Sequence, residues 1–255
     1  SLMAAYSYKE QSQLDAEDRD FARAAAPFEL VPDSRTNSGV LSLRQDLGSR
    51  AGFFADALYS QRNAGNALVQ GGIFTVFTDN STEQTQLSTG AYKEFAKTWR
   101  GEVFVVASLN DDQSASVRVL NGDVVAQFDV NQNSTYYEAG GKLDGEIITL
   151  PAGAVRASFG AGYAEEDYET NINVINVRST NEVLSRDSAY LFAETFVPLV
   201  SPDMGVPLVH ALELTAAARF TDYSDLGSDT VPRVGVAWSP VEQLRLRSSY
   251  SESFR

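Results

Sequence analysis

The sequence predicts an all-β protein built from antiparallel strands. Apolar and polar residues alternate along many stretches, and long helical patterns are scarce in the 255 residues. In the stretch 155–164, for example, Val155, Phe159 and Tyr163 stand on one face, while Arg156 and Ser158 stand on the other. A period of two is typical of a strand with one apolar face. The same alternation predicts strands at 53–59, 103–109, 124–130, 212–220, 234–238 and 244–250.

One segment near the amino terminus departs from this pattern. Residues 15–26 are rich in alanine, begin with acidic residues and are followed by Pro27. Acidic residues suit the start of a helix, and proline cannot continue one. We expect a loop with about two helical turns there.

Two architectures are consistent with such strands. In a soluble β-sandwich the apolar faces meet in a core between two sheets, whereas in a membrane barrel they face lipid and the polar faces line the lumen. Arg156, Arg245 and Arg247 stand in mid-strand among small residues, which suits a lumen or a solvated face. The mean hydropathy of −0.21 does not decide, because a barrel hides its apolar residues by alternation.

The predicted connections favour the membrane barrel. Two short connections that contain proline, 200–207 and 239–243, fall at the same end if the strands alternate in direction. The acidic stretches 165–169 and 222–229 fall at the other end, and we expect longer loops there. Short turns at one end and longer loops at the other are typical of outer-membrane barrels.

The composition excludes several classes of function. Lys and Arg number 20 against 34 Asp and Glu, and 20 − 34 gives −14, which argues against a nucleic-acid partner. There are no cysteines, so disulfides, thiolate zinc sites and iron–sulfur clusters are excluded. The single histidine, His210, excludes a site with several histidines. We expect neither a cofactor nor an enzyme.

Several local features allow a functional and a structural interpretation. His210 could act in catalysis or ligate haem, but its position beside a turn favours the membrane edge. Asp111–Asp112 and the run 165–169 could bind calcium, but acidic loops of this kind are usually solvated. Paired carboxylates could also indicate a glycosidase, but among 34 acidic residues such pairs arise by chance.

The aromatic and glycine residues that stand out also have two interpretations. Tyr136, Tyr137 and Trp99 could stack on a sugar, but an aromatic girdle at the membrane boundary is favoured. Gly65 and the pair Gly71–Gly72 lack the strand–loop–helix context of a phosphate-binding loop, and we interpret them as turn or strand glycines.

Residues 190–255 carry a resemblance to a known family. The chain reads YLFAETFVPL from Tyr190, LELTAAARFTDYSDLG from Leu212, VPRVGVAWSP from Val231 and LRLRSSYSESFR from Leu244. These segments resemble, in order and spacing, the barrel motifs of TonB-dependent outer-membrane receptors. Mild departures are Phe220 where tyrosine is common, Arg233 where lysine is common and Ser253 where glycine is common. The motif positions are Tyr190, Glu194, Pro198, Arg219, Tyr223, Gly227, Pro232, Gly235, Trp238, Pro240, Arg247, Phe254 and Arg255.

An earlier stretch adds weaker support. Residues 150–166 resemble the family's Leu-Pro-Ala-Gly-x-Val-Arg segment and the strand after it, with Gly162 and Ala164 as departures. Residues 1–149 show no sharp signature of the family.

The resemblance implies the fold, location and activity of the whole protein. Family members have a 22-stranded barrel with an amino-terminal plug inside it, and they import ferric siderophores, haem, cobalamin or carbohydrates across the bacterial outer membrane. The TonB complex supplies energy through a segment before the plug. By this resemblance residues 1–255 are a partial barrel domain of about ten to twelve strands, and the motifs are densest in 186–255. Outer-membrane lipid and a small nutrient would be its partners.

The resemblance also suggests roles for single residues. Glu194, Arg219 and Arg247 would face the lumen and pair with one another or with the plug, and the motif positions would be structural. We expect both ends of the chain to be cut, with the plug lying outside it. A passive porin and a soluble sandwich module remain the alternatives.

Overall fold

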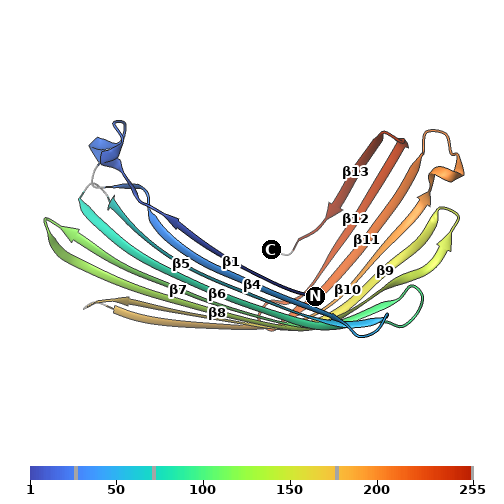
Figure 1. Ribbon diagram of the computed structural model, residues 1–255, viewed down its shortest axis with the longest axis horizontal. Coiled ribbons are helices and arrows are strands. Elements are labelled where there is room, and N and C mark those ends of the chain that lie inside the picture. Colours follow the sequence, from blue (N-terminus) through green and yellow to red (C-terminus); the bar gives the residue numbers. More distant parts are fainter. Residues whose placement is uncertain (26–27, 71–72, 176–177, 254–255) are drawn as a thin grey trace.

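Eleven strands form a single antiparallel sheet in which each strand pairs with its neighbour in the chain (Figure 1). The computed structural model describes residues 1–25, 28–70, 73–175 and 178–253. The sheet curves into a trough, with β1 and β13 at opposite edges. Its strands are β1 (Leu2–Gln11), β4 (Asp33–Asp46), β5 (Ala51–Gln70), β6 (Phe74–Glu94), β7 (Arg100–Leu120), β8 (Asp123–Leu150), β9 (Gly153–Val174), β10 (Arg178–Val200), β11 (Ala211–Tyr223), β12 (Gly227–Val241) and β13 (Leu244–Ser251).

The predicted fold class is confirmed, and the sandwich alternative is wrong. The described residues form this large sheet and one two-stranded sheet, whereas a sandwich needs two large sheets packed face to face. The eleven strands fall within the expected ten to twelve. The total of 22 strands for a complete barrel stays a prediction.

The segment between β1 and β4 forms the only described excursion from the meander. It contains β2 (Leu14–Asp15) and β3 (Glu29–Val31), which pair with each other, and two 3-10 helices, η1 (Ala16–Asp18) and η2 (Arg23–Ala25). These helices lie where two helical turns were expected. Pro27 lies outside the described residues.

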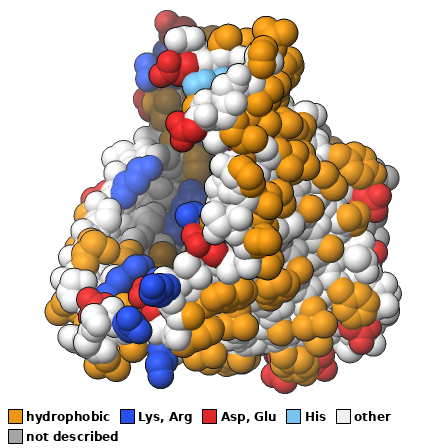
Figure 2. Space-filling view, turned by 90° about the vertical axis from the view of Figure 1, so that its right-hand side faces the viewer, with side chains coloured by type: hydrophobic (Ala, Val, Ile, Leu, Met, Phe, Trp, Pro, Cys, Tyr) orange, Lys and Arg blue, Asp and Glu red, His pale blue; other side chains and the backbone are white. Residues whose placement is uncertain are grey.

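The strand register separates the side chains into an outer and an inner face. Because side chains alternate across a strand, paired positions lie on the same face. Val103, Leu143 and Phe159 share the outer face, as do Leu214 and Val236, and all are 37–63% exposed. Figure 2 shows hydrophobic side chains spread over the outside of the sheet and Lys and Arg side chains around its hollow. This is the polarity expected of a barrel wall between lipid and a wet lumen.

Aromatic residues mark one boundary of the apolar outer face. In several strands an outward aromatic residue is followed two positions later, on the same face, by a carboxylate. Two of these pairs are hydrogen-bonded: the Tyr8 hydroxyl donates to Glu10 at 3.1 Å, and the Tyr250 hydroxyl donates to Glu252 at 2.9 Å. An aromatic girdle below a charged rim is the usual form of a membrane–water boundary. The pairs are Tyr8–Glu10, Tyr163–Glu165, Phe220–Asp222 and Tyr250–Glu252.

Aromatic rings pack over glycines on the inner face. A Cβ atom at Gly160 would lie 2.1 Å from the Phe192 ring, and one at Gly162 would lie 2.5 Å from the Tyr190 ring. Phe54 covers Gly90 and Phe104 covers Gly140 in the same way. The glycines therefore provide the space in which these rings lie flat on the neighbouring strand. Tyr190 is only 7% exposed as a result.

The prediction that the acidic stretches 165–169 and 222–229 form longer loops is wrong. We call the end with connections 47–50, 95–99, 151–152, 201–210 and 242–243 the near end, and the opposite end the far end. At the far end, residues 165–169 lie within β9, and only 224–226 connect β11 to β12. The acidic stretches pair in register with neighbouring strands, so the hairpins extend as sheet beyond the apolar band. Backbone pairing satisfies the peptide groups there, while exposed side chains meet water.

Two connections at the near end show how the local sequence determines the turn. Leu150 pairs with Gly153 across a turn of two residues, Pro151 and Ala152, and Gly153 has φ +135°. Only glycine adopts such a backbone conformation without strain. At the near end, β11 begins at Ala211 rather than near Leu208, because 3-10 helix η3 (Pro202–Met204) lengthens the connection.

Candidate functional site on the inner wall

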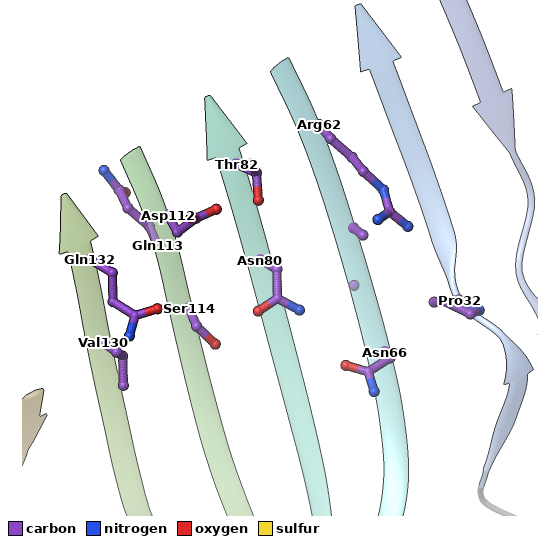
Figure 3. Close-up of a pocket in the computed structure, with 12 residues that line it drawn as sticks. Pro32, Arg62, Asn66, Asn80, Thr82, Asp112, Gln113, Ser114, Val130 and Gln132 are labelled. Carbon is purple, nitrogen blue, oxygen red and sulfur yellow. The ribbon is translucent and has the colours of Figure 1, made fainter. Parts of the chain in front are cut away.

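A polar pocket lies on the inner face of β5 to β8, toward the far end (Figure 3). It has a volume of about 490 Å³. The side chains come from four consecutive strands, and Pro32, which follows β3, closes one side. The polar side chains that line it are Arg62 and Asn66 from β5, Asn80 and Thr82 from β6, Asp112 and Ser114 from β7 and Gln132 from β8.

The strand register explains why these side chains meet. Arg62 pairs with Thr82, Thr82 with Asp112, and Asp112 with Gln132, so the four stand in one row across the sheet. The next row toward the far end contains Ala64, Asn80, Ser114 and Val130. The pocket therefore presents amide and hydroxyl groups, one guanidinium and one carboxylate, which together can bind a polar ligand through hydrogen bonds.

Toward the near end, the inner wall is occupied by an ionic network. The Glu102 carboxylate lies 3.1 Å from the Arg100 guanidinium and 3.8 Å from the Lys142 ammonium. The Arg100 guanidinium also lies 4.0 Å from the centre of the Tyr92 ring, and the Tyr92 hydroxyl donates to Asp46 at 2.5 Å. These charges are mutually neutralised, unlike those of the pocket.

A second inner cluster surrounds Glu138. Its carboxylate accepts hydrogen bonds from the Tyr136 hydroxyl at 2.9 Å and from the Tyr190 hydroxyl at 2.5 Å. The Arg219 guanidinium lies 4.0 Å from the centre of the Tyr190 ring, and its Nε donates to Thr221 at 3.3 Å. The Tyr190 bond passes over β9 at Gly162, and Arg219 belongs to β11, so the cluster spans the four strands β8 to β11.

The predicted pairing of motif charges is only partly tested by this arrangement. Glu194, Arg219 and Arg247 occupy the inner face, but no hydrogen bond or ion pair joins them to one another in the described ranges. Arg219 uses Tyr190 and Thr221 instead. Contact of these charges with a plug stays a prediction.

Several of the remaining motif positions lie at turns and irregularities of strands. A register shift lies between Pro198 and Val200 in β10, and another lies between Trp238 and Val241, around Pro240. The other positions are distributed along β11 and β12. The centre of the Tyr223 ring lies 5.6 Å from the Arg186 guanidinium, and Gly227 begins β12 with φ +76°. The Pro232 carbonyl accepts a hydrogen bond from the Glu252 backbone amide, and Gly235 faces Thr215. Trp238 Nε1 donates to the Leu208 carbonyl at 3.1 Å. Phe254 and Arg255 lie outside the described residues.

Residues that are adjacent in the sequence lie on opposite faces of the sheet at two predicted sites. Tyr136 lies on the inner face, so the girdle interpretation is wrong for it, whereas Tyr137 lies outside and is 46% exposed. Asp111 and Asp112 likewise face opposite sides of β7. The reason is the alternation of side chains along a strand, which sends adjacent residues apart.

The other local features are found near the ends of strands or within them. Trp99 covers Gly145 beside a near-end turn, and His210 is half-buried directly before β11. Gly65 lies within β5, while Gly71 and Gly72 lie outside the described residues. In the described ranges, no group of three or more His, Asp or Glu side chains is placed to hold a metal ion.

The residues of the pocket were not predicted from the sequence. No motif marks them, but the even positions from Thr78 to Ser88 in β6 are all polar: Thr78, Asn80, Thr82, Gln84, Gln86 and Ser88. A run of polar residues at every second position indicates a wet strand face. This run of polar residues does not reveal which strands lie beside β6, so the pocket could not be predicted from it.

Comparison with known proteins agrees with this architecture. The family model described as the TonB dependent receptor-like beta-barrel matches residues 17–255. The comparison with curated proteins found no match. None of the helices in the described part of the chain is long or apolar enough to cross a membrane.

Two solved structures illustrate the similarity of fold. The RagAB peptide importer in its open-open state has a TM-score of 0.68 and 10% identity, covering 98% of this chain and 34% of that chain. The outer membrane transporter YddB from Escherichia coli has a TM-score of 0.51 and 13% identity, covering 93% of this chain and 41% of that chain. The chain thus spans about one third of the length of the first of these and about two fifths of the second. With the family match, the two-faced sheet and the aromatic boundary, the chain belongs to the TonB-dependent receptor β-barrel family of the bacterial outer membrane.

Proposed function

We propose that the chain is part of the barrel wall of a receptor that imports a scarce nutrient across the outer membrane with energy from the TonB complex. The observation that carries the proposal is the family match over residues 17–255 of a sheet that is apolar outside and polar inside. The domain extends beyond these residues, and the plug and the energy-coupling segment belong to the rest of the protein. The far end, where hairpins extend beyond the aromatic girdle, faces the cell exterior.

The inner pocket would then lie on the path of the nutrient. A ligand that enters from the far end meets Arg62, Asn80 and Asp112 before it reaches the ionic network around Glu102. Such a receptor binds its ligand tightly and releases it when force on the plug rearranges the site, so no covalent chemistry is required. Siderophores, haem, cobalamin and carbohydrates are candidate nutrients, and the similarity of fold to the RagAB peptide importer adds peptides.

Uptake by intact cells tests the proposal against a passive porin. Cells lacking the full-length receptor are compared with cells lacking TonB, using a panel of labelled nutrients at limiting concentration. We expect both deletions to abolish uptake of the same compound. Uptake that depends on the receptor but persists without TonB would establish the porin alternative.

A further inference from the structure

Most polar side chains of the pocket lack the hydrogen bonds between strands that polar side chains of the surrounding inner wall form. Polar side chains around the pocket pair across strands: Ser38 with Ser60, Thr78 with Ser116 and Asn110 with Ser134, at 3.0–3.2 Å. Gln132, at the β8 edge of the pocket, likewise donates to the Tyr168 hydroxyl at 2.7 Å. Among the described residues, no hydrogen bond or ion pair involves the side chains of Arg62, Asn66, Asn80, Thr82, Asp112 or Ser114. These six side chains therefore have their hydrogen-bonding capacity available to water or to a ligand.

Two of these side chains carry opposite charges and stand apart in the same row. Arg62 and Asp112 are separated by Thr82, so they lie two strands from each other. Neighbouring strands are about 4.8 Å apart, which places the two backbones roughly 10 Å from each other. Figure 3 shows Arg62 directed toward the β4 side and Asp112 directed toward Thr82. No described carboxylate forms an ion pair with Arg62, and no described cation forms one with Asp112.

A second positive charge lies beyond Arg62 in the same row of side chains. Lys9 of β1 pairs with Thr36, and Thr36 pairs with Arg62, so Lys9 continues the row beyond Arg62 on the inner face. The pocket wall is therefore positive toward β1 and negative at β7. A ligand with separated opposite charges would match both sides, whereas a purely anionic ligand would be repelled by Asp112 and a neutral one could form hydrogen bonds but no ion pair with either side.

We propose that this pocket binds a short peptide with free termini, about three residues long, in an extended conformation across β5 to β7. An extended chain spans at most about 3.5 Å per residue, so three residues match the separation of roughly 10 Å between the two strand backbones. The peptide's carboxylate binds the Arg62 guanidinium, which can donate two parallel hydrogen bonds, and its ammonium group binds Asp112.

The neutral side chains of the pocket suit the peptide groups between the termini. Asn66 and Asn80 can both donate and accept, as peptide groups do, and the hydroxyls of Thr82 and Ser114 can take either role. The pocket has no aromatic side chain on which a sugar ring or a haem could stack. This inference rests on the proposed import function and names its substrate class.

Binding to the purified full-length receptor tests the inference. The probes are tri-alanine, its amino-terminally acetylated form, its carboxyl-terminally amidated form and maltotriose as a carbohydrate, each measured by titration calorimetry. Because each charged contact is strong, we expect blocking either terminus to weaken binding about tenfold or more. Equal affinity for free and blocked peptides, no peptide binding, or tighter binding of maltotriose would overturn the proposal.

Matched substitutions assign the two ends of the peptide. Arg62→Gln should remove the preference for the free carboxylate over the amide, and Asp112→Asn should remove the preference for the free ammonium over the acetylated form. Arg35→Gln and Asp111→Asn are the controls, because these residues lie at a similar height on the outer face. The controls should leave both preferences unchanged, and an equal loss in the controls would refute the assignment.

Uptake separates this inference from the proposed function. If tri-alanine binds as described but enters cells equally with and without TonB, the energised import is wrong while the pocket assignment stands. If import of another compound depends on TonB while no peptide binds, the pocket assignment alone is wrong.

Discussion

At the residue scale, aromatic rings on the inner wall depend on glycines in the neighbouring strand for their space. Gly160 leaves space for Phe192, since a Cβ atom there would lie 2.1 Å from the ring. We expect Gly160→Ala to lower the free energy of unfolding of the full receptor by about 1–3 kcal/mol, because the ring must leave its position. Urea titration in lipid vesicles measures this change.

The control for this substitution is Gly39→Ala, which has nothing within 4 Å of its Cβ position. It should be neutral or slightly stabilising, because alanine restricts the unfolded chain more than glycine does. The cost of Gly160→Ala should shrink in a Phe192→Ala background, since the clash is then absent. An unchanged cost in that background would show that the ring is not the cause.

The Tyr190 hydroxyl allows a second test at this scale. It donates to Glu138 at 2.5 Å from a side chain that is 7% exposed. Tyr190→Phe should lower the free energy of unfolding by about 1.5 kcal/mol, as expected for a hydrogen bond to a charged group. Tyr250→Phe, whose bond to Glu252 lies on an exposed rim, should change it by far less. Equal effects of the two substitutions in the same titration would contradict the buried role of Tyr190.

At the scale of elements, an ion pair fastens β10 to the hairpin between β11 and β12. The Arg186 guanidinium donates three hydrogen bonds of 2.8–3.0 Å to the Asp225 carboxylate, and the Ser224 hydroxyl accepts from the Asp187 backbone amide at 2.9 Å. The hydrogen bonds from Arg186 hold the pKa of Asp225 below its usual value of 3.8. The ion pair between Arg186 and Asp225 is therefore present at neutral pH.

The sign of the pH dependence follows from the lowered pKa. The contribution of Asp225 is fully present above the pKa of the unfolded chain and is lost as the pH falls through the lower folded value. We expect cleavage near 224–226 by an acid-active protease to rise only below about pH 4 in the native receptor, and already at higher pH in Asp225→Asn. Asp203→Asn, in a turn at the opposite end, is the control and should not alter this cleavage. If cleavage depended on pH identically in the native receptor and in Asp225→Asn, the ion pair between Arg186 and Asp225 would not be what stabilises the turn.

At the scale of the whole molecule, the two faces of the sheet determine its place in the membrane. Val105 is central in the apolar outer face and is 50% exposed, while Ser108 lies three residues along on the inner face. Val105→Lys should cost about 2–4 kcal/mol of folding free energy in a bilayer, because the ammonium group would face hydrocarbon. Ser108→Lys should cost much less, since the lumen is wet. Fractionation and folding into vesicles measure both, and equal costs would refute the assignment of the faces.

The sequence alone determined the fold class, the two faces and the family. Alternation in stretches such as 155–164 and 212–220 was sufficient, because an apolar face against lipid imposes a period of two on each strand separately. The family was visible because several of its motif residues, such as Pro198, Gly227 and Pro240, stand at turns and bulges, where few residue types fit.

Only the tertiary structure decided which side chains meet. The row from Arg62 to Gln132 joins residues 70 positions apart, and the bond between Tyr190 and Glu138 joins residues 52 positions apart. These meetings depend on the register between strands, and a shift of one residue would reverse every face. The acidic stretches 165–169 and 222–229 also looked like loops until their pairing was known. The sequence thus encodes the pattern within each strand, whereas the pocket arises only from the alignment of four strands.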